Sequence, residues 1–341
     1  MIPGLPELAE LEKVLKGLPA SARVETLTHV EYKDQRFPIH AISFGSTVPN
    51  VPTIGYFAGV HGLERIGTRV AISYLKTLSH LIRWDPSMAY FLSQVRMVFV
   101  PLINPVGMYL QSRSNGNGVD LMRNAPVEAD KVSRFFLVAG HRISARLPWY
   151  RGPLGAPMEV EAKAVCDFVR REIYPSSVSI ALDIHSGYGT KDRIWFPFAR
   201  TTKPFPNLAE VYALKDLLDI TYPNHVYEVE PQSLQYTTHG DLWDYLYDEH
   251  QKLEGNRLFL PLALELGSWM WVKKNPRQLF SLLGAFNPLL PHRYKRALRR
   301  HLTLFDFLLR SVCAGGWARL EPEKKQQLEQ DALNLWYGKA A

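Results

Sequence analysis

Four runs of almost uninterrupted apolar residues recur along the chain, and they limit the folds that it can adopt. They cover residues 52–60, 95–103, 178–184 and 258–266. A short run of this kind is typical of a strand that is buried on both faces. Because helical segments separate these runs, we predict an α/β fold in which a single mixed, mostly parallel twisted β-sheet is flanked by helices on both faces.

The segments between these runs carry apolar residues at the spacing of an amphipathic helix. Residues 106–157 are the exception, because they are rich in Gly, Pro, Asn and Arg and are expected to form loops. No internal repeat divides the chain, so we predict one main domain over residues 1–314 and a helical tail over 315–341 that packs on the domain or on a partner. The predicted helices cover residues 5–18, 66–82, 158–173, 208–220, 294–312 and 320–337, and two further strands cover 39–44 and 193–199.

Bulk composition excludes several classes of protein. With 341 residues and 46% hydrophobic content, the chain can bury a large core. The net charge of +7 suits a soluble domain, although a mildly positive field would also favour acidic substrates. The basic residues are dispersed apart from a cluster at 295–300, so no nucleic-acid partner is expected. Cys166 and Cys313 fit neither a disulfide scaffold nor a cysteine zinc site. With no secretory signal and no membrane-spanning run, we expect a cytoplasmic protein without a membrane partner.

Three side chains that can carry chemistry lie at the carboxyl ends of the apolar strands. They are His61, His185 and Glu265. Open α/β sheets bind their ligands at that edge. We therefore expect these side chains to meet in one site.

Glu64 extends the first of these positions into an H-x-x-E motif with His61. Zinc binds imidazole nitrogen and carboxylate oxygen, and a catalytic zinc site uses three protein ligands. Taken alone, an H-x-x-E pair is usually an ordinary polar turn, and a strand-end histidine such as His185 is usually structural. Together, two histidines and one glutamate form a common catalytic zinc set, so we predict one Zn²⁺ per chain at these residues.

The most specific motif is R-S-N-G-N-G-V-D-L-M-R-N at residues 113–124. It follows H-x-x-E and an Asn-Pro pair, and it precedes His-Ser and a late glutamate after an apolar strand. This order resembles that of the zinc carboxypeptidases over about residues 40–310. The long motif matches the family pattern except at Met122. The resemblance implies that the main domain is catalytic.

The resemblance implies a role for each residue of the metal site. His61, Glu64 and His185 match the zinc ligands of the family. Asp120 matches the aspartate that orients the first ligand histidine. Glu265, in L-A-L-E-L-G, matches the general base that activates water.

The resemblance also implies where the substrate binds. Arg113 matches the arginine that stabilises the oxyanion, and Arg123 matches the arginine that docks the terminal carboxylate of the substrate. Asn124 is placed with Arg123 among the substrate-binding residues. Two positions depart from the family. Met122 replaces an asparagine that binds the terminal carboxylate and cannot donate that hydrogen bond, and Leu63 replaces an arginine that some members carry.

A tyrosine-rich segment completes the resemblance. Tyr236, in Y-T-T-H-G-D-L-W-D-Y, matches the mobile tyrosine that closes over the substrate, and Tyr245 and Tyr247 are rival choices. The same alignment puts Trp243 near the specificity pocket, where a large indole would shrink or close it.

These observations predict a zinc-dependent hydrolase that cleaves a C-terminal residue or an amide bond of a peptide. The alternatives are an N-acyl amino-acid deacylase of the aspartoacylase and succinylglutamate desuccinylase type, and an amidase that acts on cell-wall peptides. A catalytically inactive binding module is the third possibility. The expected partner is a peptide or a small acylated amino acid, and the oligomeric state does not follow from the sequence.

Overall fold

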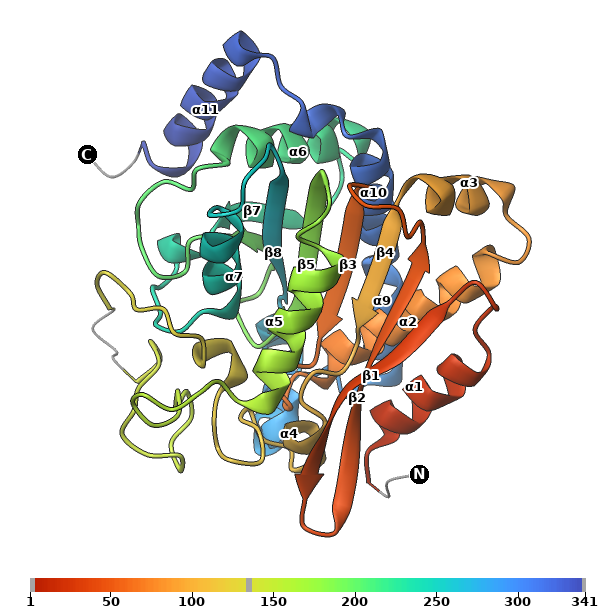
Figure 1. The fold of residues 1–341 in the computed structure, drawn as a ribbon. Helices are drawn as coiled ribbons and strands as arrows, with labels where there is room; N and C mark the ends of the chain where they lie inside the picture. Colours follow the sequence, from red (N-terminus) through yellow and green to blue (C-terminus); the bar gives the residue numbers. More distant parts are fainter. Residues whose placement is uncertain (1–3, 133–136, 339–341) are drawn as a thin grey trace.

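One mixed β-sheet forms the centre of the molecule (Figure 1). The computed structural model describes residues 4–132 and 137–338, so residues 1–3 of the predicted domain and 339–341 of the predicted tail lie outside it. The strands are β1 (Arg23–Tyr32), β2 (Gln35–Gly45), β3 (Thr53–Ala58), β4 (Arg96–Val100), β5 (Val178–Ser186), β6 (Asp192–Phe196), β7 (Tyr227–Pro231) and β8 (Leu258–Leu266).

The eight strands lie in the order β1-β2-β4-β3-β5-β8-β6-β7. The central pairs β3–β4, β3–β5 and β5–β8 are parallel, as is β6–β7 at one edge. The pairs β1–β2, β2–β4 and β6–β8 are antiparallel. The predicted α/β class with a mixed, mostly parallel sheet is therefore confirmed.

Helices cover both faces of this sheet (Figure 1). On β3, the ring of Phe57 contacts Phe168 and Trp243 on one face, whereas Tyr56 contacts Tyr74 and Phe305 on the other. This alternation explains why the strand is apolar throughout, since neither face meets water. The helices are α1 (Pro6–Lys16), α2 (Arg65–Leu81), α3 (Pro86–Gln94), α4 (Pro105–Tyr109), α5 (Val160–Glu172), α6 (Leu208–Thr221), α7 (Leu242–His250), α8 (Trp269–Lys274), α9 (Pro291–Arg300), α10 (Leu302–Ala314) and α11 (Pro322–Trp336).

The parallel strands β3, β5 and β8 end at the same edge of the sheet. Their register pairs Ala58 with Ile184 and His185 with Glu265. A residue that follows β3 therefore lies close to residues at the ends of β5 and β8. This edge carries the candidate site.

The C-terminal helix α11 packs against α6. The Trp336 indole donates a hydrogen bond of 2.9 Å to the carbonyl of Val229, and its ring lies 4.7 Å from that of Phe196. Helix α11 thus packs on the same domain as the sheet. Among residues 4–132 and 137–338, no helix has the length and apolar character needed to cross a bilayer.

Candidate active site

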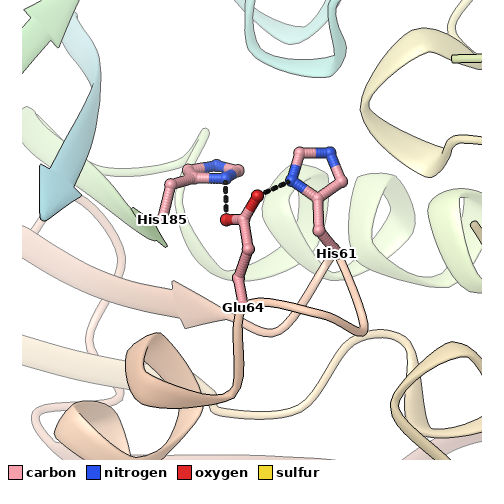
Figure 2. Close-up of side chains that lie close together, drawn as sticks. All are labelled: His61, Glu64 and His185. Carbon is pink, nitrogen blue, oxygen red and sulfur yellow. Dashed lines mark hydrogen bonds and ion pairs between the residues drawn. The ribbon is translucent and has the colours of Figure 1, made fainter. Parts of the chain in front are cut away.

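Three side chains converge at the carboxyl edge of the sheet (Figure 2). Glu64 Oε1 lies 2.8 Å from His61 Nδ1, and Glu64 Oε2 lies 3.2 Å from His185 Nδ1. One donor atom from each residue lies within 4.8 Å of the others, and all three side chains are buried. The structure thus brings together the residues of the predicted metal site, in a geometry that could hold a metal ion.

A tight turn between β3 and α2 presents the first two residues. Gly62 permits the turn, since a Cβ atom there would lie 2.1 Å from the backbone of Gly107. Asn287 holds the turn from the far end of the chain, because it accepts from Ile66 N at 2.9 Å and donates to Leu63 O at 2.8 Å. It thereby satisfies backbone groups at the start of α2 that no helical partner can reach.

Each histidine has a carboxylate behind it. His61 Nε2 lies 3.3 Å from Asp120 Oδ1, and His185 Nε2 lies 2.8 Å from Asp183 Oδ2. A carboxylate at Nε2 favours the tautomer that leaves Nδ1 available to a metal. Both rings therefore present Nδ1 toward Glu64, which is the arrangement that a shared cation requires.

The electrostatics of the cluster also favour a cation. Burial alone would raise the pKa of Asp120, but Arg113 and His61 outweigh it and hold this pKa well below its usual range. Burial likewise opposes ionisation of Glu64, yet the two histidines lower its pKa. When both imidazoles are neutral, as metal binding requires, the ionised Glu64 and Asp120 outnumber the nearby guanidinium of Arg113, so a divalent cation would offset their charge.

Comparison with known proteins decides the family. The family model described as "Zinc carboxypeptidase" matches residues 26–258, which is more than half of the chain. The chain belongs to the zinc carboxypeptidase family. The resemblance predicted from the motifs is confirmed, although the matched range ends before Glu265.

Individual carboxypeptidases are similar to this chain over a limited stretch. Carboxypeptidase SOL1 of Arabidopsis thaliana is 25% identical over 121 residues, which cover 34% of this chain and 25% of that protein. Carboxypeptidase E of Caenorhabditis elegans is 28% identical over 120 residues, covering 30% of this chain and 25% of that protein. The match therefore spans about a quarter of the length of these relatives.

Solved structures support the same fold. Thrombin activatable fibrinolysis inhibitor superposes with a TM-score of 0.66 at 18% identity, over 91% of this chain and 74% of that one. Carboxypeptidase A from Helicoverpa armigera superposes with a TM-score of 0.64 at 16% identity, over 90% of this chain and 72% of that one. At such identities the likeness shows the fold alone.

A cleft of about 750 Å³ opens beside His61, Glu64 and His185, and Glu265 and Arg113 also line it. The Oε2 atom of Glu265 is buried and has no hydrogen-bond partner among the described residues. Burial raises the pKa of this carboxyl, and the negative charge of Glu64 acts in the same direction. Arg113 donates from Nε to Asp120 at 2.7 Å and lies 3.5 Å from Glu64.

The second arginine of the motif, Arg123, also lines the cleft. Its side chain is 3% exposed, and its Nε has no hydrogen-bond partner among the described residues. The contacts nearest to it are a long hydrogen bond of 3.4 Å to the Tyr236 hydroxyl and a separation of 3.9 Å from Asp241. A buried guanidinium with so few partners favours an anionic ligand.

The structure distinguishes among the tyrosines proposed from the sequence. Tyr236 lines the cleft. Tyr245 instead accepts from Arg170 at 3.3 Å, and the Tyr247 hydroxyl donates to Asn207 at 2.7 Å in the core. Neither is among the residues that line the cleft. Of the three candidate tyrosines, Tyr236 is therefore the one that lies at the cleft.

Asn124 is placed differently from the expectation that it binds substrate. Its Nδ2 donates to Arg151 O at 3.0 Å, and its Oδ1 accepts from Glu159 N at 2.6 Å. It is not among the residues that line the cleft. Since both polar atoms of the amide already bind backbone, this placement gives a substrate role no support.

The two residues that depart from the family pattern, Leu63 and Met122, both line the cleft, and so does Trp243. Trp243 is 4% exposed, and its indole donates to Asp183 Oδ2 at 2.9 Å. Asp183 Oδ2, which faces His185, therefore also holds the Trp243 ring in the wall of the cleft. Met122 gives the cleft an apolar surface beside Arg123 in place of a hydrogen-bond donor.

Sequence reasoning assigned no role to Asp183, Asp241 or Asn287. A local signal existed for Asp183, because a residue two positions before a strand histidine points to the same face. Asp241 caps α7 by accepting from Trp243 N at 3.0 Å, and a helix start preceded by Asp was readable from the sequence. No local signal could have found Asn287, which acts 221 residues away from Ile66.

Proposed function

We propose that this chain is a zinc-dependent hydrolase that cleaves a C-terminal residue or an amide bond of a peptide. The observation that carries the proposal is the convergence of His61, Glu64 and His185 beside Glu265, a buried glutamate whose Oε2 has no hydrogen-bond partner within residues 4–132 and 137–338. This set supplies what hydrolysis of an amide requires: three ligands for one metal ion and a base at the same edge.

The donor set fits zinc, since two imidazole nitrogens and one carboxylate are a common catalytic combination. His61, Glu64 and His185 would hold the ion. A bound zinc ion supplies Lewis-acid chemistry, polarising a carbonyl and making water more acidic. Asp120 and Asp183 keep the two imidazole rings in the required orientation.

Glu265 is the proposed general base. It takes a proton from water as the oxygen–carbon bond forms, and it gives that proton to the nitrogen as the carbon–nitrogen bond breaks. Its raised pKa suits the first step, because a less acidic carboxyl group is a stronger base, and a pKa closer to neutrality still lets the same group return the proton. Replacing it by glutamine removes proton transfer and leaves the proposed metal ligands unchanged.

The two arginines have separate proposed tasks. Arg113 stabilises the negative oxygen that develops on the attacked carbonyl, and such a donor contributes roughly 3–4 kcal/mol to the transition state. Its ion pair with Asp120 holds it beside Glu64. Arg123 binds an anionic group of the substrate, and Tyr236 is placed to cover that group.

A second candidate function is cleavage of an amide whose neighbour is not a free α-carboxylate. Met122 cannot donate a hydrogen bond, and Asp241 places a second buried carboxylate 3.9 Å from Arg123. Both features weaken the binding of a terminal carboxylate. They favour an amidase or a deacylase whose substrate carries its anionic group elsewhere.

The test combines metal analysis with a substrate panel. Purified protein is assayed for bound metal and for cleavage of peptides with free C-termini, amidated peptides and N-acyl amino acids. Zinc with cleavage of free C-termini alone establishes a carboxypeptidase, whereas zinc with activity on the other substrates alone establishes an amidase or a deacylase. No zinc after zinc is added back would refute the proposal, and zinc without any activity would favour an inactive binding module.

Two variants sharpen the assignment. Glu265→Gln should bind zinc normally and lose activity by roughly 10²–10⁴-fold. Glu161→Gln is the matched control, because Glu161 is a buried glutamate outside the cleft. Activity of Glu265→Gln close to that of the control would rule out this base.

A further inference from the structure

The positive charge of the protein comes from one segment. Of the 40 Lys and Arg residues, eight lie between Glu265 and Asp306, whereas none of the 33 Asp and Glu residues lies between these two. The rest of the chain therefore holds 32 basic and 33 acidic residues, which nearly cancel. The basic residues of the segment are Lys273, Lys274, Arg277, Arg293, Lys295, Arg296, Arg299 and Arg300.

Most of this charge is exposed and unpaired. Arg293 donates to the Trp271 carbonyl and Arg300 pairs with Asp192. The other six side chains are exposed and form no ion pair with any residue in the described ranges. On α9, the exposed positions Lys295, Arg296 and Arg299 share one face, because they are spaced three and four residues apart. The solvent face of this helix is thus a cationic stripe.

The same segment shows a reversal of normal burial. Gln278 is 1% exposed, whereas Phe280 is 94% exposed and Leu279 is 56% exposed. The Gln278 amide donates to Gly284 O at 2.9 Å, which closes the turn between two short helices, η3 (Pro276–Phe280) and η4 (Leu282–Ala285). A buried glutamine therefore fixes a turn that holds apolar side chains in water, an arrangement that typically marks an interaction surface.

These features lie in one continuous segment, residues 269–299, in which the Arg293 guanidinium joins α9 to α8 by donating to Trp271 O at 3.1 Å, and we call its exposed basic and apolar side chains the basic apolar face. Its exposed apolar residues also include Leu282, 65% exposed, Leu289, 47% exposed, and Trp269, 47% exposed. Leu282 also lines the catalytic cleft, as does Phe286 in the same segment. The face therefore reaches the mouth of the cleft. Its members are Trp269, Lys273, Lys274, Arg277, Leu279, Phe280, Leu282, Leu289, Lys295, Arg296 and Arg299.

We propose that the basic apolar face binds peripherally to the surface of an anionic lipid bilayer. Lysine and arginine near such a surface are attracted to acidic headgroups, while protruding aromatic and aliphatic side chains enter the headgroup boundary. Docking here would hold the cleft mouth close to the membrane. The sequence had led us to expect no membrane partner, because no segment could span a bilayer, but peripheral binding requires no spanning helix.

Other occupants fit the face less well. A second copy of the chain would bring two cationic faces together, and their repulsion opposes that contact. A soluble polyanion would match the charge, but it offers nothing to aliphatic side chains such as Leu279 and Leu289. A fluid bilayer accepts a protruding Phe280 without needing a complementary groove. Of these three occupants, the bilayer is the one that satisfies both the charge and the apolar exposure of the face.

The experiment is vesicle co-sedimentation with the full chain. We expect binding to vesicles of phosphatidylcholine with about 30% phosphatidylglycerol at about 0.1 M salt, weaker binding at higher salt, and little binding to phosphatidylcholine alone. Replacing Lys295, Arg296 and Arg299 together by glutamine should lower the partition coefficient about 100-fold, since each basic residue contributes about fivefold. Phe280→Ala should lower it about 10-fold.

Matched controls isolate the face. Arg36, Lys252 and Arg257 are exposed basic residues without ion pairs elsewhere in the described chain, and their triple glutamine variant should bind like wild type. Trp84→Ala controls for the loss of an exposed aromatic, since Trp84 is 71% exposed.

Three outcomes would overturn the proposal. The first is no binding to the acidic vesicles, and the second is equal loss in the control variants. The third is binding to polyglutamate or an oligonucleotide as tight as to vesicles and unaffected by Phe280→Ala, which would assign the face to a soluble polyanion.

Discussion

Asp183 gives the sharpest test of how the site is built. A single oxygen, Oδ2, accepts from His185 Nε2 at 2.8 Å and from the Trp243 indole at 2.9 Å. The substitution Asp183→Asn keeps the shape and leaves an oxygen that can accept both bonds, but it removes the charge. It therefore asks whether the negative charge behind the ring strengthens the bond between His185 and a metal.

The expected magnitude follows from two estimates. A hydrogen bond to a charged group contributes about 1.5–3 kcal/mol, against about 1 kcal/mol for a neutral pair, so the loss is roughly 0.5–2 kcal/mol. Removing a partner of this kind from a ligand histidine typically weakens metal binding 10–100-fold, which is about 1.4–2.7 kcal/mol. The two ranges overlap, so we expect a zinc Kd raised at least about tenfold.

The assay is competition between the protein and a zinc chelator at fixed pH, with thermal unfolding of metal-free and zinc-loaded samples. Zinc should raise Tm less in Asp183→Asn than in wild type, because stabilisation follows the Kd. Trp243→Phe removes only the indole donor and should leave the Kd within about threefold. Asp192→Asn controls for the loss of a buried aspartate outside the site.

An unchanged zinc Kd in a folded Asp183→Asn protein would refute this reasoning. It would mean that packing alone orients His185. An equal loss in Trp243→Phe would instead show that the cleft wall, rather than the charge, holds the ring.

Three further predictions concern stability and assembly of the site. Gly62→Ala should lower the free energy of unfolding by about 3 kcal/mol and abolish zinc binding, because its Cβ would collide with backbone. Urea unfolding tests this, with Gly316→Ala as the control because a Cβ at Gly316 would meet no atom within 4 Å. Equal stabilities of the two variants would contradict the prediction. Asn287→Ala should cost roughly 2–4 kcal/mol, since two backbone groups lose their partner, and zinc binding near wild type would contradict a role in shaping the turn. Burial lowers the pKa of His301 to about 4, so below about pH 6.5 the unfolded state takes up the proton first, and the free energy of unfolding falls by up to about 3 kcal/mol at pH 4. In His301→Asn, the free energy of unfolding should decline less between pH 7 and pH 4. Identical slopes in the variant and the wild type would contradict this assignment.

Much of the fold followed from periodicity, because strands buried on both faces leave a plain apolar signal. The strands β3, β5 and β8 were predicted almost to the residue. The edge strands β1 and β7 were missed, since their exposed side is polar and their pattern resembles that of a loop. The predicted helix 294–312 is two helices, α9 and α10, which meet at the buried His301.

The residues of the candidate site were likewise only partly predictable from the sequence. His61, His185 and Glu265 were readable because a strand end predicts where a side chain will lie. The family resemblance favoured Tyr236, but the sequence left Tyr245 and Tyr247 as rivals, because excluding them depends on how α7 (Leu242–His250) packs against the sheet. Contacts between distant segments leave no local pattern, and for that reason the sequence carries no trace of them.

The bond between Ile66 and Asn287 has a consequence for biosynthesis. The segment that carries His61 and Glu64 leaves the ribosome before Asn287, which lies 221 positions after Ile66 and whose amide holds the turn. A nascent chain that ends before Asn287 lacks this support, so the proposed zinc site would be completed only after Asn287 has been synthesised. Metal loading would then be a late event that follows closure of the domain, which would protect the growing chain from binding metal in a misfolded state.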